Sequence, residues 1–167
     1  MADITLGGKP CHTSGELPAV GATAPNFRLV TTDLQDVTLE TYRGKMKVLS
    51  IIPSLGTGVC AASARKFNEK AASIRDAVVL VISADLPFTM KSFCATEGLH
   101  NVVALSMMRG RNFAKEYGTL ITDGPWEGIS GRAVVVIDAN DKVVYTQLVK
   151  EIGEEPNYDA ALAAIAK

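Results

Sequence analysis

A cysteine that follows a predicted strand lies in a segment suited to thiol chemistry. The apolar, β-branched run at residues 48–52 predicts a buried strand ending at Pro53, and the segment Pro-Ser-Leu-Gly-Thr-Gly-Val-Cys leads from there to Cys60. We expect a helix to begin here, with Thr57 as its N-cap and the threonine hydroxyl within reach of Cys60 in the third helical position. Unpaired backbone N–H groups and the helix dipole favour a thiolate at such a position. The segment therefore predicts an activated nucleophile, with an ordinary buried cysteine as the alternative.

An amphipathic helix is expected to carry this cysteine. Between residues 58 and 74 the less polar positions recur at helical spacing, and charged residues occupy the other faces. The less polar positions are Cys60, Ala64, Phe67, Ala71 and Ile74, and the charged ones are Arg65, Lys66, Glu69 and Lys70. Cys60 is therefore expected in the opening turn of a helix that packs against a core.

The remaining apolar runs predict strands that alternate with helices. The expected strands are residues 77–83, 102–106, 133–138 and 143–148, and the expected helices are residues 87–97, 112–117 and 156–166. The short polar connection between the last two strands allows only an antiparallel hairpin. This order predicts an α/β fold with a central mixed β-sheet flanked by helices, which is the plan of the thioredoxin-like fold.

The length of the chain predicts one compact domain. Its 167 residues are close to the usual domain size, so we expect residues 1–167 to form a single domain. The turn-forming residues near the start, with Gly7 and Gly8 at the turn, predict an N-terminal β-hairpin within about residues 1–15.

Composition excludes several classes of function. A net charge of −1, from 17 basic and 18 acidic side chains, argues against nucleic acid as a partner. No apolar run approaches the ~20 residues that cross a bilayer, and the first residues show no secretory signal, which is absent or already removed. We therefore expect a cytoplasmic protein without a membrane partner. Cys11, Cys60 and Cys94 are too few for a disulfide scaffold and lack the spacing of a zinc site.

The string Pro53-x-x-x-Thr57-x-x-Cys60 directly after a strand resembles the active-site signature of peroxiredoxins. Three further runs resemble the bacterial thiol peroxidase branch, the atypical two-cysteine peroxiredoxins. These runs are Ile-Ser-Ala-Asp-Leu-Pro-Phe at residues 82–88, Phe-Cys-Ala-Thr-Glu-Gly-Leu at residues 93–99 and Arg-Ala-Val-Val-Val-Ile-Asp at residues 132–138. The resemblance covers nearly the whole chain. It implies a thiol-dependent peroxidase of antioxidant defence that reduces hydrogen peroxide and organic hydroperoxides.

The same resemblance implies a role for each of five residues. Cys60 would be the peroxidatic cysteine, oxidised to sulfenic acid, and Cys94 would resolve it to an intramolecular disulfide. Arg132 would supply fixed positive charge that stabilises the thiolate and polarises the peroxide. The Thr57 hydroxyl would contact both the sulfur and the substrate oxygen, and Pro53 would shield the site from water.

Each of three assignments has a structural alternative. Thr57 is also a plain helix cap, and Arg132 is also a candidate surface charge at the start of a strand. Cys94 is also a candidate core cysteine, packed beside Phe93. Cys94 lies 34 positions after Cys60 on a different predicted helix, so a bridge between them requires local unwinding of one or both helices.

The implied cycle uses no metal or organic cofactor. The resemblance further implies thioredoxin as the reductant and a homodimer whose interface lies near the active site. A thiol–disulfide oxidoreductase acting on proteins is disfavoured, because such enzymes carry a Cys-x-x-Cys pair that is absent before Cys60. A redox-sensing module without catalytic turnover is the other alternative.

Two further features are given no catalytic role. Cys11 stands beside His12 in the predicted hairpin, and we expect it to be a solvent-exposed bystander, although the histidine could depress its pKa. Arg109 and Arg111 predict a solvated basic patch, with a partner surface as the alternative.

Overall fold

A seven-stranded sheet forms the centre of the computed structural model, which describes residues 1–74 and 76–165. Its strands are β3 (Leu29–Thr31), β4 (Asp36–Val37), β5 (Met46–Ile51), β6 (Ala77–Ser83), β7 (Val103–Ser106), β8 (Ala133–Ile137) and β9 (Val143–Leu148). They lie in the order β4-β3-β7-β6-β5-β8-β9. Strands β5, β6 and β7 run parallel, whereas β3 and β8 are antiparallel to their neighbours β7 and β5. The predicted mixed sheet is confirmed.

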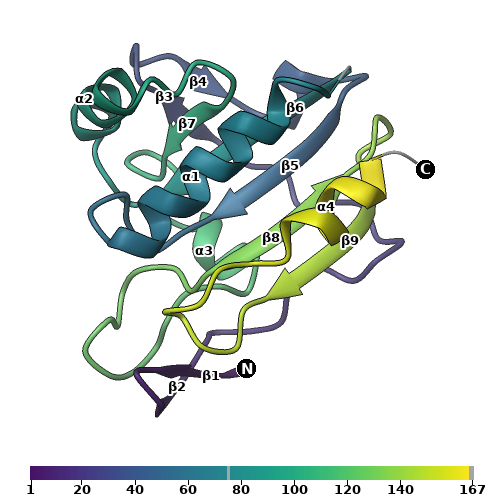
Figure 1. The fold of residues 1–167 in the computed structure, drawn as a ribbon. Helices are drawn as coiled ribbons and strands as arrows, with labels where there is room; N and C mark the ends of the chain where they lie inside the picture. Colours follow the sequence, from purple (N-terminus) through teal and green to yellow (C-terminus); the bar gives the residue numbers. More distant parts are fainter. Residues whose placement is uncertain (75, 166–167) are drawn as a thin grey trace.

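Helices cover both faces of this sheet (Figure 1). They are α1 (Gly58–Ala71), α2 (Pro87–Glu97), α3 (Phe113–Glu116), α4 (Tyr158–Ile165) and the 3-10 helix η1 (Leu39–Tyr42). Buried side chains of α1, α2 and α4 form one core with β5, β6 and β8. Side chains of α3 and η1 form a second core against the opposite face. Within the described residues, no helix is both long and apolar enough to cross a membrane.

The topology brings three segments to one edge of the sheet. Because β5 and β6 are parallel, the chain leaves both strands at the same edge, after Ile51 and after Ser83. Strand β8 is antiparallel to β5 and begins there, with Ala133 paired to Ile51. Arg132 therefore lies beside the loop that leads from β5 into α1.

The predicted N-terminal hairpin is present as β1 (Asp3–Leu6) and β2 (Lys9–His12). Its turn needs glycine, since Gly7 and Gly8 both have positive φ, at 59° and 77°. The hairpin packs on the segment after β9, where the Thr5 amide donates to the Lys150 carbonyl (2.7 Å). The Ile152 amide donates in turn to the Thr5 carbonyl (2.9 Å).

Most element bounds agree with the sequence patterns, and the differences have physical reasons. Helix α2 begins at Pro87 and ends before Gly98, whose φ of 65° is the left-handed conformation of a helix C-terminus. Helix α1 ends at Ala71 and not at residue 74, and α4 begins at Tyr158 and not at residue 156. The predicted end of that last helix, at residue 166, lies outside the described residues. Elements β3, β4 and η1 span two to four residues each, too few to show a hydrophobic period, and were not predicted.

Candidate active site

Cys60 occupies the predicted position in the first turn of α1 and is fully buried. Thr57 is the N-cap, with extended backbone at φ −92° and ψ 145°. The predicted reach of its hydroxyl to Cys60 is wrong, because the hydroxyl donates to the Ser54 carbonyl instead (3.2 Å). The hydrogen bond to the Cys60 sulfur comes instead from another part of the chain.

The donor is Arg132, whose Nη1 atom donates to the Sγ atom of Cys60 at 3.2 Å. Its Nε atom donates to the carbonyl of Ile152 at 2.9 Å, which fixes the plane of the guanidinium. The interpretation of Arg132 as a surface charge is wrong, because its side chain is only 1% exposed. Among the described residues, no carboxylate forms an ion pair with this guanidinium. The hydrogen-bond partners of this buried guanidinium, among the described residues, are thus the Ile152 carbonyl and the Cys60 sulfur.

The interior side of the site is formed by helices α1 and α4. The ring of Tyr158 packs edge-on against Phe67, with centroids 5.0 Å apart, and its hydroxyl donates to Glu155 (2.8 Å). Burial raises the pKa of Tyr158 to about 12, although the charge of Arg132 acts in the opposite direction. Tyr158 therefore stays neutral at physiological pH.

The loop before α1 is partly open to solvent. Pro53 and Leu55 are buried, Thr57 is half-buried, and Gly56 and Gly58 are exposed. Solvent therefore meets the loop on either side of Thr57. The loop is held by Asp85, in the connection between β6 and α2, whose carboxylate accepts hydrogen bonds from the Ser54 hydroxyl and the Leu55 amide.

Cys94 lies on α2, as predicted, and is half-buried. It packs with Phe93 against the core that contains Cys60, as the structural alternative expected. Burial raises the pKa of the Cys94 thiol, so in this conformation the thiol is held protonated. Neither Cys60 nor Cys94 forms a disulfide, and the structure thus represents the reduced state.

The expectation that Cys11 is exposed is wrong. Its side chain is 4% exposed and packs with Ile4, Ile121 and Ile152 between the hairpin and the rest of the chain. Burial, followed by the charge of Asp123, raises the pKa of the Cys11 thiol. The neighbouring His12 does not activate it, because that imidazole is bound to Asp123.

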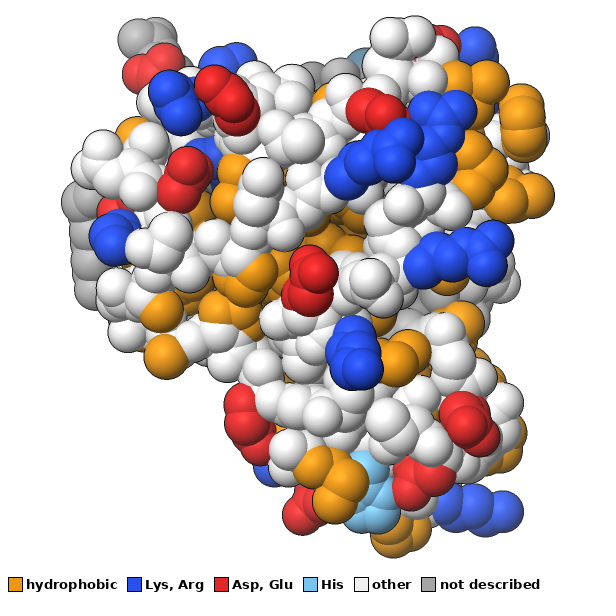
Figure 2. All heavy atoms as spheres, turned by 180° about the vertical axis from the view of Figure 1, so that it is seen from behind, with side chains coloured by type: hydrophobic (Ala, Val, Ile, Leu, Met, Phe, Trp, Pro, Cys, Tyr) orange, Lys and Arg blue, Asp and Glu red, His pale blue; other side chains and the backbone are white. Residues whose placement is uncertain are grey.

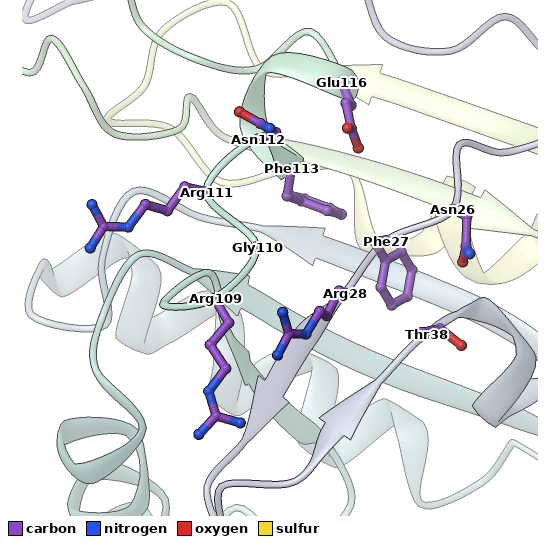
Figure 3. Close-up of a pocket in the computed structure, with 10 residues that line it drawn as sticks. All are labelled: Asn26, Phe27, Arg28, Thr38, Arg109, Gly110, Arg111, Asn112, Phe113 and Glu116. Atoms are coloured by element: carbon purple, nitrogen blue, oxygen red, sulfur yellow. The ribbon is translucent and has the colours of Figure 1, made fainter.

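A separate surface hollow of about 320 Å³ contains the predicted basic patch (Figure 3). Arg109 forms an ion pair with Asp36 (2.9 Å), and Asp36 also forms an ion pair with Arg28. Arg111 extends away from the phenylalanines that line the hollow (Figure 3). None of the residues identified around Cys60 lines it.

Three contributors to the site were missed by sequence reasoning. The Ile152 carbonyl has no sequence signal, because any residue carries a carbonyl. Tyr158 was included only in a predicted helix. Asp85 belongs to the run at residues 82–88 that resembles thiol peroxidases, so its position in that run was the available signal.

Comparisons with known proteins identify a family and several similar chains. Residues 19–162 match the family model described as Redoxin. A curated thiol peroxidase of Leptospira interrogans is 49% identical over 166 residues, which cover 98% of this chain and 97% of that protein. The solved structure of a peroxiredoxin-like protein from Aquifex aeolicus has a TM-score of 0.94 at 40% identity, covering 99% of this chain and 96% of that chain.

A thiol peroxidase from Chromobacterium violaceum has a TM-score of 0.87 at 26% identity, with coverage of 98% of this chain and 95% of that chain. The predicted thioredoxin-like fold and the resemblance to thiol peroxidases are thereby confirmed. The chain belongs to the Redoxin family, and within it to the thiol peroxidase branch of the peroxiredoxins.

Proposed function

We propose that this enzyme reduces hydrogen peroxide and organic hydroperoxides through Cys60. The observation that carries the proposal is the contact of 3.2 Å between the Arg132 guanidinium and the Cys60 sulfur, made inside the protein at the start of α1. A fixed positive charge in a buried site favours the thiolate and needs no rearrangement as further negative charge develops.

In the first step the Cys60 thiolate attacks the terminal oxygen of the hydroperoxide. The S–O bond forms as the O–O bond breaks, and the leaving oxygen takes a proton, so that an alcohol or water departs. Arg132 stabilises the charge on the sulfur and on the leaving oxygen. The Thr57 hydroxyl turns from the Ser54 carbonyl to the peroxide, and Pro53 excludes water from the sulfur.

In the second step the Cys94 sulfur attacks the sulfenic sulfur of Cys60. The S–S bond forms, water leaves, and the product is an intramolecular disulfide. Both helices are intact in the reduced state, so we infer that at least one unwinds locally before the sulfurs meet. Exposure of Cys94 on unwinding also removes the burial that raises its pKa, which favours its nucleophilic form.

In the third step a dithiol reductant returns both cysteines to thiols and leaves as a disulfide. We propose thioredoxin as that reductant and therefore place the enzyme in the cytoplasm, where such dithiols are kept reduced. Every electron of the cycle passes through sulfur, so the proposal includes no metal or organic cofactor.

We propose that the enzyme is a homodimer with its interface next to the active site. Leu86 and Phe88, at the start of α2, are 51% and 64% exposed. Figure 2 shows hydrophobic side chains gathered at the edge of the molecule on the α2 side. This surface adjoins the loop before Cys60, because Asp85 binds Leu55.

A peroxidase assay coupled to thioredoxin and its reductase tests the proposed activity. The wild type should consume peroxide catalytically, and Cys60→Ser should consume none, because a serine hydroxyl is not ionised at neutral pH and is a poor nucleophile toward oxygen. Activity retained by Cys60→Ser would exclude the mechanism. A redox-sensing module would form sulfenic acid on Cys60 without sustained turnover.

A further inference from the structure

The carboxylate of Asp85 links the two cysteine-bearing segments at the edge of the sheet. One oxygen accepts a hydrogen bond from the Ser54 hydroxyl (2.7 Å). The other accepts from the backbone amide of Leu55 (2.8 Å) and from the hydroxyl of Ser83 (2.6 Å). Two of these three bonds reach into the loop that carries Thr57 and leads to Cys60.

The backbone of Asp85 is anchored equally firmly. Its carbonyl accepts from the Ser106 hydroxyl (2.5 Å) at the end of β7, and its amide donates to the Ser83 hydroxyl (3.2 Å) at the end of β6. Leu86, the next residue, is the N-cap of α2, which carries Cys94. Asp85 is thus fixed to two central strands and lies between the peroxide site and the resolving helix.

Apart from the burial of Pro53 and Leu55, the loop that Asp85 holds is restrained mainly by hydrogen bonds at Ser54. It contains one exposed glycine, Gly56, and a second, Gly58, opens α1 directly after it; glycine has the largest conformational freedom of any residue. The Ser54 hydroxyl, bound by Asp85, accepts from the amide of Gly56 (3.0 Å). The Ser54 carbonyl accepts from both the hydroxyl and the amide of Thr57 (3.2 and 3.3 Å). The position of Thr57 therefore depends on Asp85 through Ser54.

We propose that Asp85 is a positioning residue for peroxide reduction, which holds the 53–57 loop in its reactive conformation and ties it to α2 until Cys60 is oxidised. The inference rests on the proposed function of Cys60 and Cys94. Without the carboxylate, the loop that carries Thr57 and Pro53 is no longer held in this conformation, so oxidation of Cys60 slows. The condensation of Cys94 with the sulfenic acid does not slow, because that step needs the loop and α2 to separate.

Two rate constants measured on Asp85→Ala test this. In a Cys94→Ser background, trapping of the sulfenic acid after rapid mixing with hydrogen peroxide gives the first rate constant. With Cys94 present, disulfide formation followed by acid quench and mass spectrometry gives the second. We expect oxidation about 10- to 100-fold slower, as for a loss of positioning, and condensation as fast as in the wild type or faster.

Asp85→Asn is the conservative variant and guards against failure of Asp85→Ala to fold. An amide retains one acceptor oxygen for the loop, so its oxidation rate should lie between those of the wild type and Asp85→Ala. Ser54→Ala should slow oxidation as well, and the double variant should be no slower than Asp85→Ala alone, because both changes break the same connection.

Asp141→Asn is the matched control for a general loss of stability. Its carboxylate binds the buried Lys47 (2.9 Å) near the first residues of β5, away from the loop that follows this strand, and asparagine tolerates its φ of 62°. We expect a lower denaturation midpoint with both rate constants unchanged. Unchanged oxidation in folded Asp85→Ala or Asp85→Asn would overturn the proposal, and so would an equal slowing of both steps. If wild-type Cys60 is not oxidised by peroxide, the proposed function fails instead.

Discussion

The Nη1 atom of Arg132 lies 3.2 Å from the Sγ atom of Cys60, and both side chains are shielded from solvent. The two residues are 72 positions apart and meet because β8 begins antiparallel to the end of β5. This pair joins a cysteine in the first turn of α1 to a fixed cation, and the proposed reactivity of Cys60 should depend on it.

Replacement of Arg132 by methionine should slow the oxidation of Cys60 by about 100-fold, because a preorganised charge next to the reacting atoms is lost. Stopped-flow oxidation by hydrogen peroxide measures the rate, and alkylation with iodoacetamide across pH should show less thiolate at neutral pH. Arg109→Met is the control, since that arginine pairs with Asp36 at a separate site. Equal oxidation rates in Arg132→Met and the wild type would show that the charge of Arg132 does not contribute to the oxidation of Cys60.

Replacement of Cys11 by serine should leave peroxide turnover close to that of the wild type while lowering stability. The thiol is buried among aliphatic side chains, so a hydroxyl in its place costs about 1–3 kcal/mol without a hydrogen-bond partner. Chemical denaturation and the coupled assay measure the two effects. A large fall in turnover at full folding would show that Cys11 takes part in the cycle.

Acid should weaken the attachment of the hairpin through Glu151. Hydrogen bonds from Thr5, Gly8 and Gly7 lower the pKa of this carboxylate from 4.5 to about 2. Because the folded-state pKa is below the unfolded one, the carboxylate stabilises the fold above about pH 4.5 and loses that contribution as the pH falls toward about 2.

The stability difference between the wild type and Glu151→Gln should therefore be largest near neutral pH and shrink as the pH falls from about 4.5 toward 2, as measured by denaturation at each pH. Ile152, whose carbonyl binds Arg132, follows Glu151 directly. For this reason Glu151→Gln should also slow Cys60 oxidation slightly at neutral pH. A stability difference that is independent of pH would contradict the role of the ionised carboxylate.

Replacement of Phe88 by glutamate should convert the proposed homodimer to a monomer. A charge in the centre of an apolar contact is left unpaired and desolvated when the partners meet. Light scattering coupled to size-exclusion chromatography measures the mass of both proteins. A wild type that is monomeric at micromolar concentration would contradict the proposed dimer.

Sequence patterns predicted the helices and strands that are long enough to show a hydrophobic pattern. Strand β6 and helix α2 were predicted with their observed bounds, because one is apolar on both faces and the other is delimited by Pro87 and Gly98. Residues 29–42 form elements too short for any period. That residues 1–167 form one folding domain stays a prediction, and a single cooperative unfolding transition would support it.

The candidate site was predictable where local chemistry or the family resemblance marked a residue. Cys60 and Thr57 lie three residues apart in one strand–loop–helix segment, so their positions followed from the sequence. The burial of Arg132 against sulfur did not, because it depends on the pairing of β8 with β5 and on a backbone carbonyl. The burial of Cys11 was missed for a similar reason, since the hairpin packs on segments more than a hundred residues away.

The most direct test of the central claim is the identity of the bond formed by one equivalent of hydrogen peroxide. Intact mass spectrometry and nonreducing peptide mapping of the reduced wild type should show the loss of two hydrogen atoms and an intramolecular bond between Cys60 and Cys94. Under the same conditions Cys94→Ser should gain one oxygen atom on Cys60. A bridge that contains Cys11, a bond between two chains, or a wild-type mass left unchanged by peroxide would contradict the account.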